Sequence, residues 1–308
     1  MGISSHVRGS GRSVFGTSFL GSCFGSLTFR HNACPFRFVD DDGLLLGVLK
    51  NNQLLVWGLA TGLCRELPNW LDELDEGYSG HFRRPTAAAL TESSSLLAVV
   101  YRGHDIIVWD IENERLHDIY GKETGSLGAR ARRRPGMVSV LSLVFNRAPE
   151  AGLLAASFND GELVVFNTAE GLVQARAPAN AHTLASPPDG LMLACGNSAG
   201  TIQVFEFDRL KLLYRIQSEE FGIKSLIFSA DSHRLIDIRG PRCRIWDPPI
   251  LMRQDTDEDN SDTLSVSTGP QDYKLDDIKQ SVHITALACA DSDDFVICGK
   301  IDSSVCLL

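Results

Sequence analysis

The chain has 308 residues, of which 44% are hydrophobic and 22% charged, an ordinary globular composition with enough length to bury a large core. Its formal net charge of −10 argues against general binding to nucleic-acid phosphates. No stretch approaches the ~18 uncharged apolar residues of a membrane helix. We therefore expect other proteins as partners, and neither nucleic acid nor a membrane.

Residues 1–31 are predicted to form an irregular N-terminal segment. They contain Arg8, Arg12 and Arg30 but no acidic residue, and Gly and Ser interrupt the apolar residues of 13–29 throughout. This composition also has some likeness to a transit peptide, which is the alternative interpretation.

From residue 32 onward one sequence pattern recurs: an apolar strand, a tight turn, and a second apolar strand that ends near an aromatic residue. The second strands lie at 54–59, 106–111, 163–168, 202–207 and 244–248, and a sixth copy stops at Leu308. The shared aromatic positions are Trp57, Trp109, Phe166, Phe205 and Trp246. The last three are spaced by about 40 residues, which is the length of one propeller blade.

The residues between these paired strands are typical of β-hairpin turns. Asn159-Asp160-Gly161, between two apolar runs, is a strong hairpin signal because such a turn requires positive φ. A further strand, such as 142–146, precedes each hairpin. Each unit is therefore a small antiparallel sheet with apolar residues on both faces, and such sheets bury each other when they stand side by side in a ring.

We expect an all-β propeller over 32–308. Its six readable blades are placed at about 32–66, 85–120, 137–176, 178–217, 221–251 and 282–308. A seventh partial blade or an incompletely closed ring is the alternative. The inserts 121–136 and 252–281 lack apolar residues and are expected to be mobile. Residues 68–84 are predicted to form a short amphipathic helix or a loop anchored by Trp70.

These features resemble the WD-repeat family over about 32–308. The Trp-Asp pairs at 109–110 and 246–247 follow apolar hairpins, and Phe228-Ser-Ala-Asp231 is similar to the family's turn before the second strand. The run Ser225–Asp247 is similar to the C-terminal repeats of fungal NACHT–WD-repeat proteins, which are signal-transducing NTPases. This resemblance implies a sensor or scaffold propeller whose partner is another protein or a NACHT domain.

The chain departs from the family in two respects. The Gly103-His104 pair lies in a hairpin turn, where the family's Gly-His pair does not belong, so most blades are expected to rely on apolar packing instead of a polar network. The phosphate-binding motif GxxxxGK[ST] of a NACHT domain is absent from the sequence.

No residue is predicted to be catalytic, cofactor-binding or metal-binding. The eight histidines are scattered and no G-x-S-x-G elbow occurs, while the acidic run at 255–262 lacks the central Gly and final Glu of a calcium loop. We expect a protein that is not an enzyme and has no cofactor. The alternatives are a propeller enzyme with a site in the central channel and a scaffold of a nuclear or RNA-processing complex.

Two groups of residues are candidates for interaction. One is the basic cluster Arg130, Arg132, Arg133 and Arg134, which could bind an acidic partner or act as a nuclear-import signal. The alternative is that these arginines lie in a solvated loop without a binding role. The other is His104 with Asp105, expected to be exposed at a turn.

The eight cysteines lie mostly in predicted apolar strands, and none forms a CxxC pair. This distribution is typical of buried thiols in a reducing compartment. A cytoplasmic location follows, with the nucleus as the alternative. Cys298 and Cys306 flank one turn and are placed across from each other, with pairing as the lesser possibility.

Overall fold

The computed structural model describes residues 36–39, 44–48, 54–58, 64–66, 85–93, 95–123, 125–127, 138–148, 152–217, 221–247, 274–289 and 296–308. Within these ranges all regular structure is β-strand, and no helix there could span a bilayer. The N-terminal segment 1–31, residues 68–84 and the arginine cluster at 130–134 lie outside the described residues.

The described strands form antiparallel sheets that each follow chain order. Blade 1 contains β1 (Phe36–Val39), β2 (Leu44–Val48), β3 (Leu54–Gly58) and β4 (Cys64–Glu66). Blade 2 contains β5 (Pro85–Leu90), β6 (Leu96–Tyr101), β7 (Ile106–Asp110), β8 (Arg115–Gly121) and the short β9 (Gly125–Ser126). Blade 3 contains β10 (Val140–Phe145), β11 (Leu153–Phe158), β12 (Glu162–Asn167) and β13 (Leu172–Pro178).

Three further sheets complete the described part. Blade 4 contains β14 (Thr183–Ala185), β15 (Met192–Gly196), β16 (Ile202–Glu206) and β17 (Leu212–Ile216). Blade 5 contains β18 (Ser225–Phe228), β19 (Leu235–Arg239), β20 (Arg242–Asp247) and β21 (Lys274–Lys279). Blade 6 contains β22 (Ile284–Cys289), β23 (Val296–Lys300) and β24 (Val305–Leu307).

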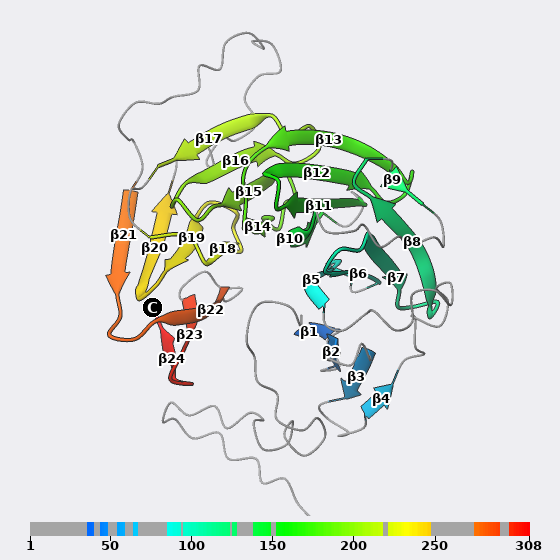
Figure 1. The fold of residues 1–308 in the computed structure, drawn as a ribbon. Coiled ribbons are helices and arrows are strands. Elements are labelled where there is room, and N and C mark those ends of the chain that lie inside the picture. The colour runs from blue at the N-terminus through cyan, green and yellow to red at the C-terminus, as the bar shows by residue number, and fades with distance from the viewer. Residues whose placement is uncertain are drawn as a thin grey trace, which may run out of the picture.

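The sheets are arranged as a propeller (Figure 1). The first strands of successive blades, β5, β10, β14, β18 and β22, contact one another in order, and the later strands of each sheet lie progressively farther out. This arrangement confirms the all-β propeller and the six readable blades of the sequence analysis.

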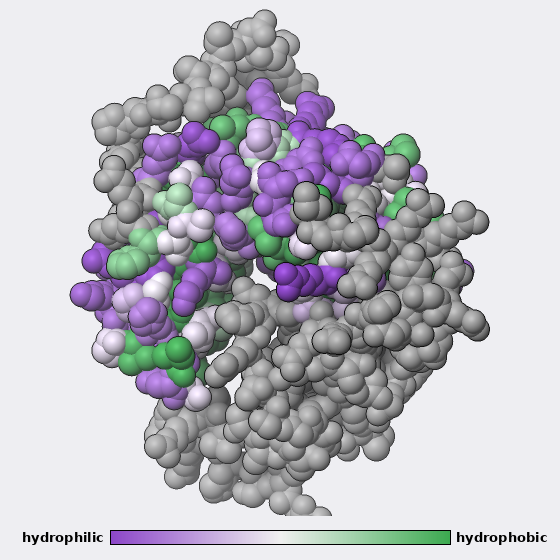
Figure 2. Space-filling view, in the orientation of Figure 1, coloured by the Kyte–Doolittle hydropathy of each residue, from purple (hydrophilic) through white to green (hydrophobic). Residues whose placement is uncertain are grey.

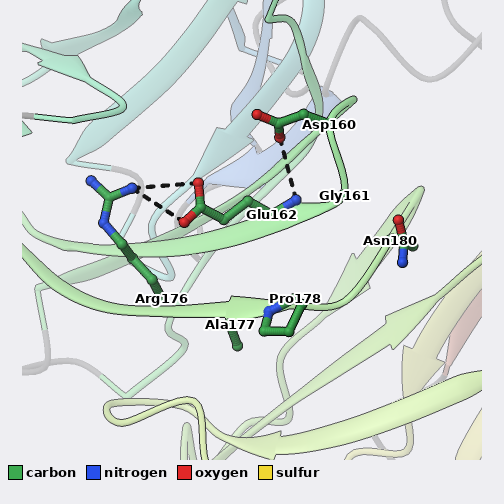
Figure 3. A pocket seen from close by; sticks show the side chains of 7 residues that line it. All are labelled: Asp160, Gly161, Glu162, Arg176, Ala177, Pro178 and Asn180. Atoms are coloured by element: carbon green, nitrogen blue, oxygen red, sulfur yellow. Dashed lines mark hydrogen bonds and ion pairs between the residues drawn. The ribbon is translucent and has the colours of Figure 1, made fainter.

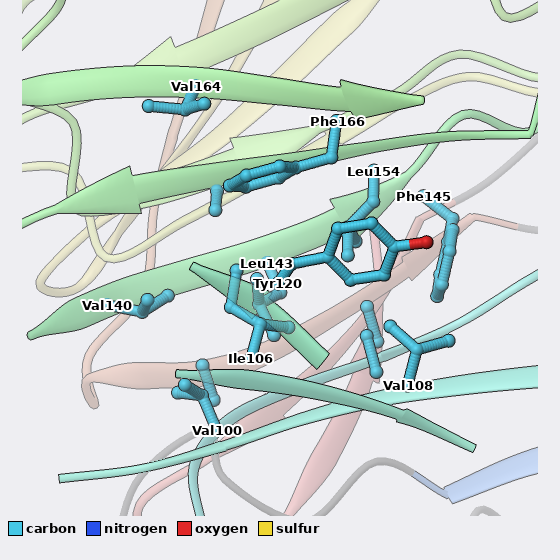
Figure 4. Close-up of a cluster of buried hydrophobic side chains, with 14 of the residues drawn as sticks. Val100, Ile106, Val108, Tyr120, Val140, Leu143, Phe145, Leu154, Val164 and Phe166 are labelled. Carbon is cyan, nitrogen blue, oxygen red and sulfur yellow. The ribbon is translucent and has the colours of Figure 1, made fainter. Parts of the chain in front are cut away.

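Most residues of the central strands are apolar because both faces of each sheet are covered. All five residues of β7 are buried. Ile106 and Val108 pack against Leu154 and Phe166 of blade 3 (Figure 4). The Tyr120 ring also stands against Phe166, with centroids 5.5 Å apart. A strand buried on one face would alternate apolar and polar residues, whereas β7 has four apolar residues in succession before Asp110.

The repeated aromatic position is a core position. Trp109 and Phe166 are fully buried, and Phe205 and Trp246 are only 3% and 1% exposed. Leu308, which takes this place in blade 6, is partly buried against the core between blades 5 and 6.

The two predicted inserts differ from expectation at their ends. Residues 121–136 begin within β8 and include β9, and residues 252–281 include β21, which is the fourth strand of blade 5. β21 pairs along the whole of β20, with Trp246 opposite Leu275. The acidic run at 255–262 separates β21 from its sheet in the sequence, so no local pattern links them.

Candidate functional site

One edge of the ring carries the turns between the second and third strands of each blade. Because consecutive antiparallel strands reverse direction, the fourth strand of a blade ends at the same edge. The connection from that strand to the next blade therefore lies there too. We call this the turn edge; it comprises the turns 102–105, 159–161, 197–201, 240–241 and 301–304 and the connections 179–182, 221–224 and 280–283.

Backbone hydrogen bonds tie the turns of blades 3, 4, 5 and 6 to the connections beside them. The carbonyl of Gly161 accepts from the backbone N–H groups of Ala179 and Asn180, both at 2.9 Å. In blade 5 the carbonyl of Gly240 accepts from the N–H of Ile284 at 3.0 Å. The turn edge is therefore a fixed backbone framework on which side chains can be presented to a partner.

An ion-pair cluster joins blades 2 and 3 at this edge. The Nζ of Lys122, which follows β8, lies 2.5 Å from Oδ2 of Asp160 and 2.6 Å from Oε2 of Glu162, and its side chain is 7% exposed. Arg176 reaches Oε1 of Glu162 at 3.3 Å and also donates to the carbonyl of Lys122. The ammonium additionally stands over the Phe158 ring, 5.2 Å from its centroid.

A pocket of about 300 Å³ lies beside this cluster (Figure 3). It is lined by Asp160, Gly161, Glu162, Arg176, Ala177, Pro178 and Asn180. The pocket is therefore formed by one turn and the end of β13, and its polar groups are largely engaged with one another.

The cluster holds its groups in their charged forms. Burial acts to raise the pKa of the Asp160 carboxyl, but the hydrogen bonds from Lys122 and from the backbone N–H of Glu162, together with the charge of Lys122, outweigh burial and lower that pKa. The hydrogen bond from Lys122 likewise lowers the pKa of Glu162, against burial. Burial acts to lower the pKa of Lys122, yet its hydrogen bonds to both carboxylates raise it.

Glycine is required at the tip of this turn. Gly161 has φ of +91°, and a Cβ there would collide with Oδ1 of Asn180. The hairpin predicted from Asn159-Asp160-Gly161 is thus confirmed, and the same glycine allows the connection to blade 4 to lie close.

Loss of Lys122 is expected to make the free energy of unfolding depend less on pH between neutral pH and about pH 3. A carboxyl with a lowered folded pKa adds stability above its unfolded pKa of about 4, and this stability disappears as the pH falls through the folded pKa. Lys122→Met should lower the free energy of unfolding by about 1 kcal/mol at neutral pH, a modest value because both carboxylates are partly exposed. The deficit should shrink by about pH 3 in urea titrations, since the carboxylates are then protonated.

Lys211→Met, at an exposed lysine, is the matched control and should show the same deficit, near zero, at both pH values. A Lys122→Met deficit that does not change with pH would contradict the role given to the cluster.

Blade 5 contains a buried polar network that sequence reasoning missed. Both carboxylate oxygens of Asp237 accept from Nε of Arg239 at 3.0 Å, and Oδ2 also accepts from Nε1 of Trp246 at 2.9 Å. The Arg239 and Asp237 side chains are completely buried. Nη1 of Arg239 reaches blade 4, where it donates to the carbonyl of Gly200 at 2.9 Å.

Blade 5 is therefore an exception to the expectation that most blades rely on apolar packing instead of a polar network. The available signal was the alternation Leu235-Ile-Asp-Ile-Arg239, which puts a carboxylate and a guanidinium on the same face of one strand.

His104 and Asp105 differ from expectation in their exposure. They lie at the turn edge of blade 2, but they are only 6% and 5% exposed, so the prediction of exposed turn residues is wrong. Gly103, with φ of +77°, allows the turn to fold inward. Their role in binding a partner stays a prediction, as does that of Arg130, Arg132, Arg133 and Arg134, which the structure does not describe.

The centre of the ring offers little acid–base chemistry in the described strands. The innermost strands β5, β10, β14, β18 and β22 carry no ionisable side chain apart from the thiol of Cys289, and the innermost strand of blade 1, β1, contains one charged residue, Arg37. Among the described residues, no group of three or more potential ligands could hold a metal ion. The charged groups instead gather outside these strands, at the turn edge and on the outer strands.

Comparisons with known proteins agree with this architecture. No protein-family model matches the chain. It is 41% identical over 54 residues to WD repeat-containing protein VIP3 of Arabidopsis thaliana, covering 18% of this chain and 17% of that protein. It is 36% identical over 64 residues to SEC12-like protein 2 of the same plant, covering 21% of this chain and 16% of that protein. The chain thus spans only a small part of the curated relatives it matches.

The three-dimensional likeness extends much further. The β-propeller domain of Cps50 (Swd1) from Myceliophteria thermophila superposes with a TM-score of 0.61 at 14% identity, covering 89% of this chain and 81% of that one. This superposition shows that the chain has a β-propeller fold, and one short segment is similar to a WD repeat-containing protein.

Proposed function

We propose that this propeller is a non-catalytic protein-interaction module whose partner docks on the turn edge. The observation that supports this proposal is the position of the charged groups: the described first strands of the six blades contain one charged residue, Arg37 of β1, and the thiol of Cys289, whereas an ion-pair cluster and a pocket lie at the turn edge. A central-channel enzyme would need the reverse, since general acid–base catalysis requires titratable groups beside the substrate.

Repeat architectures favour this role because adjacent blades present a continuous rigid surface. Much of the described surface in Figure 2 is hydrophilic. Against that background Phe221, in the connection from blade 4 to blade 5, is 67% exposed. Exposed aromatic residues in a polar surround are frequent binding anchors.

A matched pair of substitutions tests the docking face. Phe221→Asp should weaken binding of a partner recovered with the wild-type chain by at least about tenfold, because an aromatic anchor is lost and a charge is desolvated. Leu191 is 69% exposed but lies in the turn between β14 and β15, at the opposite edge. Leu191→Asp should bind like wild type in the same titration, and equal effects of the two substitutions would refute docking on the turn edge.

We further propose that the partner is a NACHT domain and that the propeller is the sensing part of a fungal NACHT-type signalling protein in the cytoplasm. The similarity of Ser225–Asp247 to the repeats of such proteins supports this assignment, and the described cysteine thiols suit a reducing compartment. Calorimetric titration of a purified NACHT domain into the propeller should give saturable binding that Phe221→Asp weakens. Absence of binding would remove the NACHT assignment while leaving the interaction module intact.

A further inference from the structure

Three cysteine thiols meet where blade 6 packs against blade 5. Cys298 of β23 and Cys306 of β24 are direct cross-strand partners, as the sequence placed them. Cys243 of β20 lies in the same cluster from the neighbouring blade. The structure holds all three as thiols.

The pairing geometry of Cys298 and Cys306 suits a disulfide. Val296 and Leu308, two positions along, exchange both backbone hydrogen bonds at 2.9 Å. Because such pairs alternate along an antiparallel ladder, Cys298 and Cys306 occupy the same kind of pair, whose Cα atoms stand about 5.5 Å apart. That separation lies within the range that a disulfide bridges without backbone movement.

The three cysteines differ in their exposure to solvent. Cys243 and Cys298 are fully buried, whereas Cys306 is partly exposed on the last strand of its sheet. Its neighbours Val305 and Leu307 are 58% and 64% exposed, and hydrophobic residues show at the surface in this region of Figure 2. A small oxidant can therefore reach Cys306 from solvent, and Cys298 lies directly behind it.

The environment of Cys298 differs from that of the equivalent cysteine in blade 4. Cys195 also lies in a second strand, and burial raises the pKa of its thiol. For Cys298, the hydrogen bond with Cys243 lowers the pKa against burial, and the contact with Cys306 and the charge of Lys300 act in the same direction. Two cysteines at the same repeat position thus have opposite tendencies to ionise, because only one is surrounded by other thiols.

We propose that Cys298 and Cys306 form a peroxide-oxidisable dithiol site that closes to a disulfide across β23 and β24. Hydrogen peroxide converts the Cys306 thiol to a sulfenic acid and releases one water. The sulfur of Cys298 then attacks that of Cys306, the S–O bond breaks, and the hydroxyl leaves with the Cys298 proton as a second water. Both thiols are oxidised and one peroxide is reduced, so the step needs no other reactant. Thiol reductants reverse it.

Peptide mapping of the full chain tests the site. The reduced protein is treated with hydrogen peroxide, alkylated with N-ethylmaleimide and digested with trypsin, which cleaves after Lys279 and Lys300. The expected product is peptide 280–300 joined through Cys298 to peptide 301–308, formed at lower peroxide concentrations than any oxidation of Cys195 and removed by dithiothreitol. A link from Cys298 to Cys243 or Cys289, or complete alkylation of Cys306 after treatment, would overturn the proposal.

Three variants separate this chemistry from general oxidation. Cys298→Ala should abolish the joined peptide even though Cys289 remains in peptide 280–300, and Cys195→Ser should leave its amount unchanged. Cys243→Ala should still form it but several-fold more slowly, because Cys298 loses a hydrogen bond that favours its thiolate. Unchanged thermal unfolding of the reduced Cys298→Ala protein shows that the variant is folded. If folded Cys298→Ala still joins peptide 280–300 to peptide 301–308, the link runs through Cys289 and the assignment is wrong.

Discussion

Asp237→Ala is expected to lower the free energy of unfolding by about 3–5 kcal/mol, because it leaves the guanidinium of Arg239 buried without its carboxylate. Asp237 accepts three hydrogen bonds from Arg239 at 2.8–3.0 Å and one from Trp246, and neither charged side chain is exposed to water. Water cannot replace the lost partner without opening the contact between blades 4 and 5. Urea denaturation followed by tryptophan fluorescence measures the loss.

The control for this result is an exposed ion pair. Glu92 and Arg147 meet at 2.8 Å with side chains about 40% exposed, so Glu92→Ala should cost no more than about 1 kcal/mol. The double variant Asp237→Leu with Arg239→Met should recover much of the loss, because it removes both buried charges. A cost below about 1 kcal/mol for Asp237→Ala, or no recovery in the double variant, would show that the buried pair does not act as described.

Trp109→Ala is expected to cost about 3–5 kcal/mol, since it removes the largest side chain of β7 from a position with no exposure to solvent. The indole is at the repeated aromatic position, where a blade packs between its neighbours and cannot collapse freely around a cavity. The midpoint of urea unfolding, monitored by far-ultraviolet circular dichroism, reports the effect.

Leu172→Ala is the matched comparison, because Leu172 is apolar but 56% exposed at the start of β13. It should change stability by no more than about 0.5 kcal/mol. If both substitutions had similar small effects, Trp109 could not be a packing residue of the blade.

Much of the fold could be predicted from local patterns. The strand predicted at 106–111 is β7 (Ile106–Asp110), and the turn at Asn159-Asp160-Gly161 has the positive φ that its glycine indicated. Hairpins are readable because turn chemistry and the apolar residues that flank it lie within about ten residues of each other. The repeated aromatic position then placed successive sheets side by side, since a thin sheet that is apolar on both faces needs neighbours.

Strand pairings, burial and ion pairs that depend on residues distant in the sequence could not be predicted from local patterns. β21 joins β20 across the acidic run 255–262, and the burial of His104 and Asp105 depends on what packs around their turn. The ion-pair cluster at Asp160 requires Lys122 from the preceding blade, and no spacing in the sequence links those residues.

The amino-acid sequence by itself determined the hairpins, the repeat and hence the propeller, because each blade is built from contacts between neighbouring segments of chain. Only the tertiary structure decided which polar groups meet. Arg239 reaches Gly200, and Cys298 meets Cys243, across the interfaces between blades. The energy of a buried charge or thiol depends on its full surroundings, and in a propeller half of those surroundings come from a different sheet.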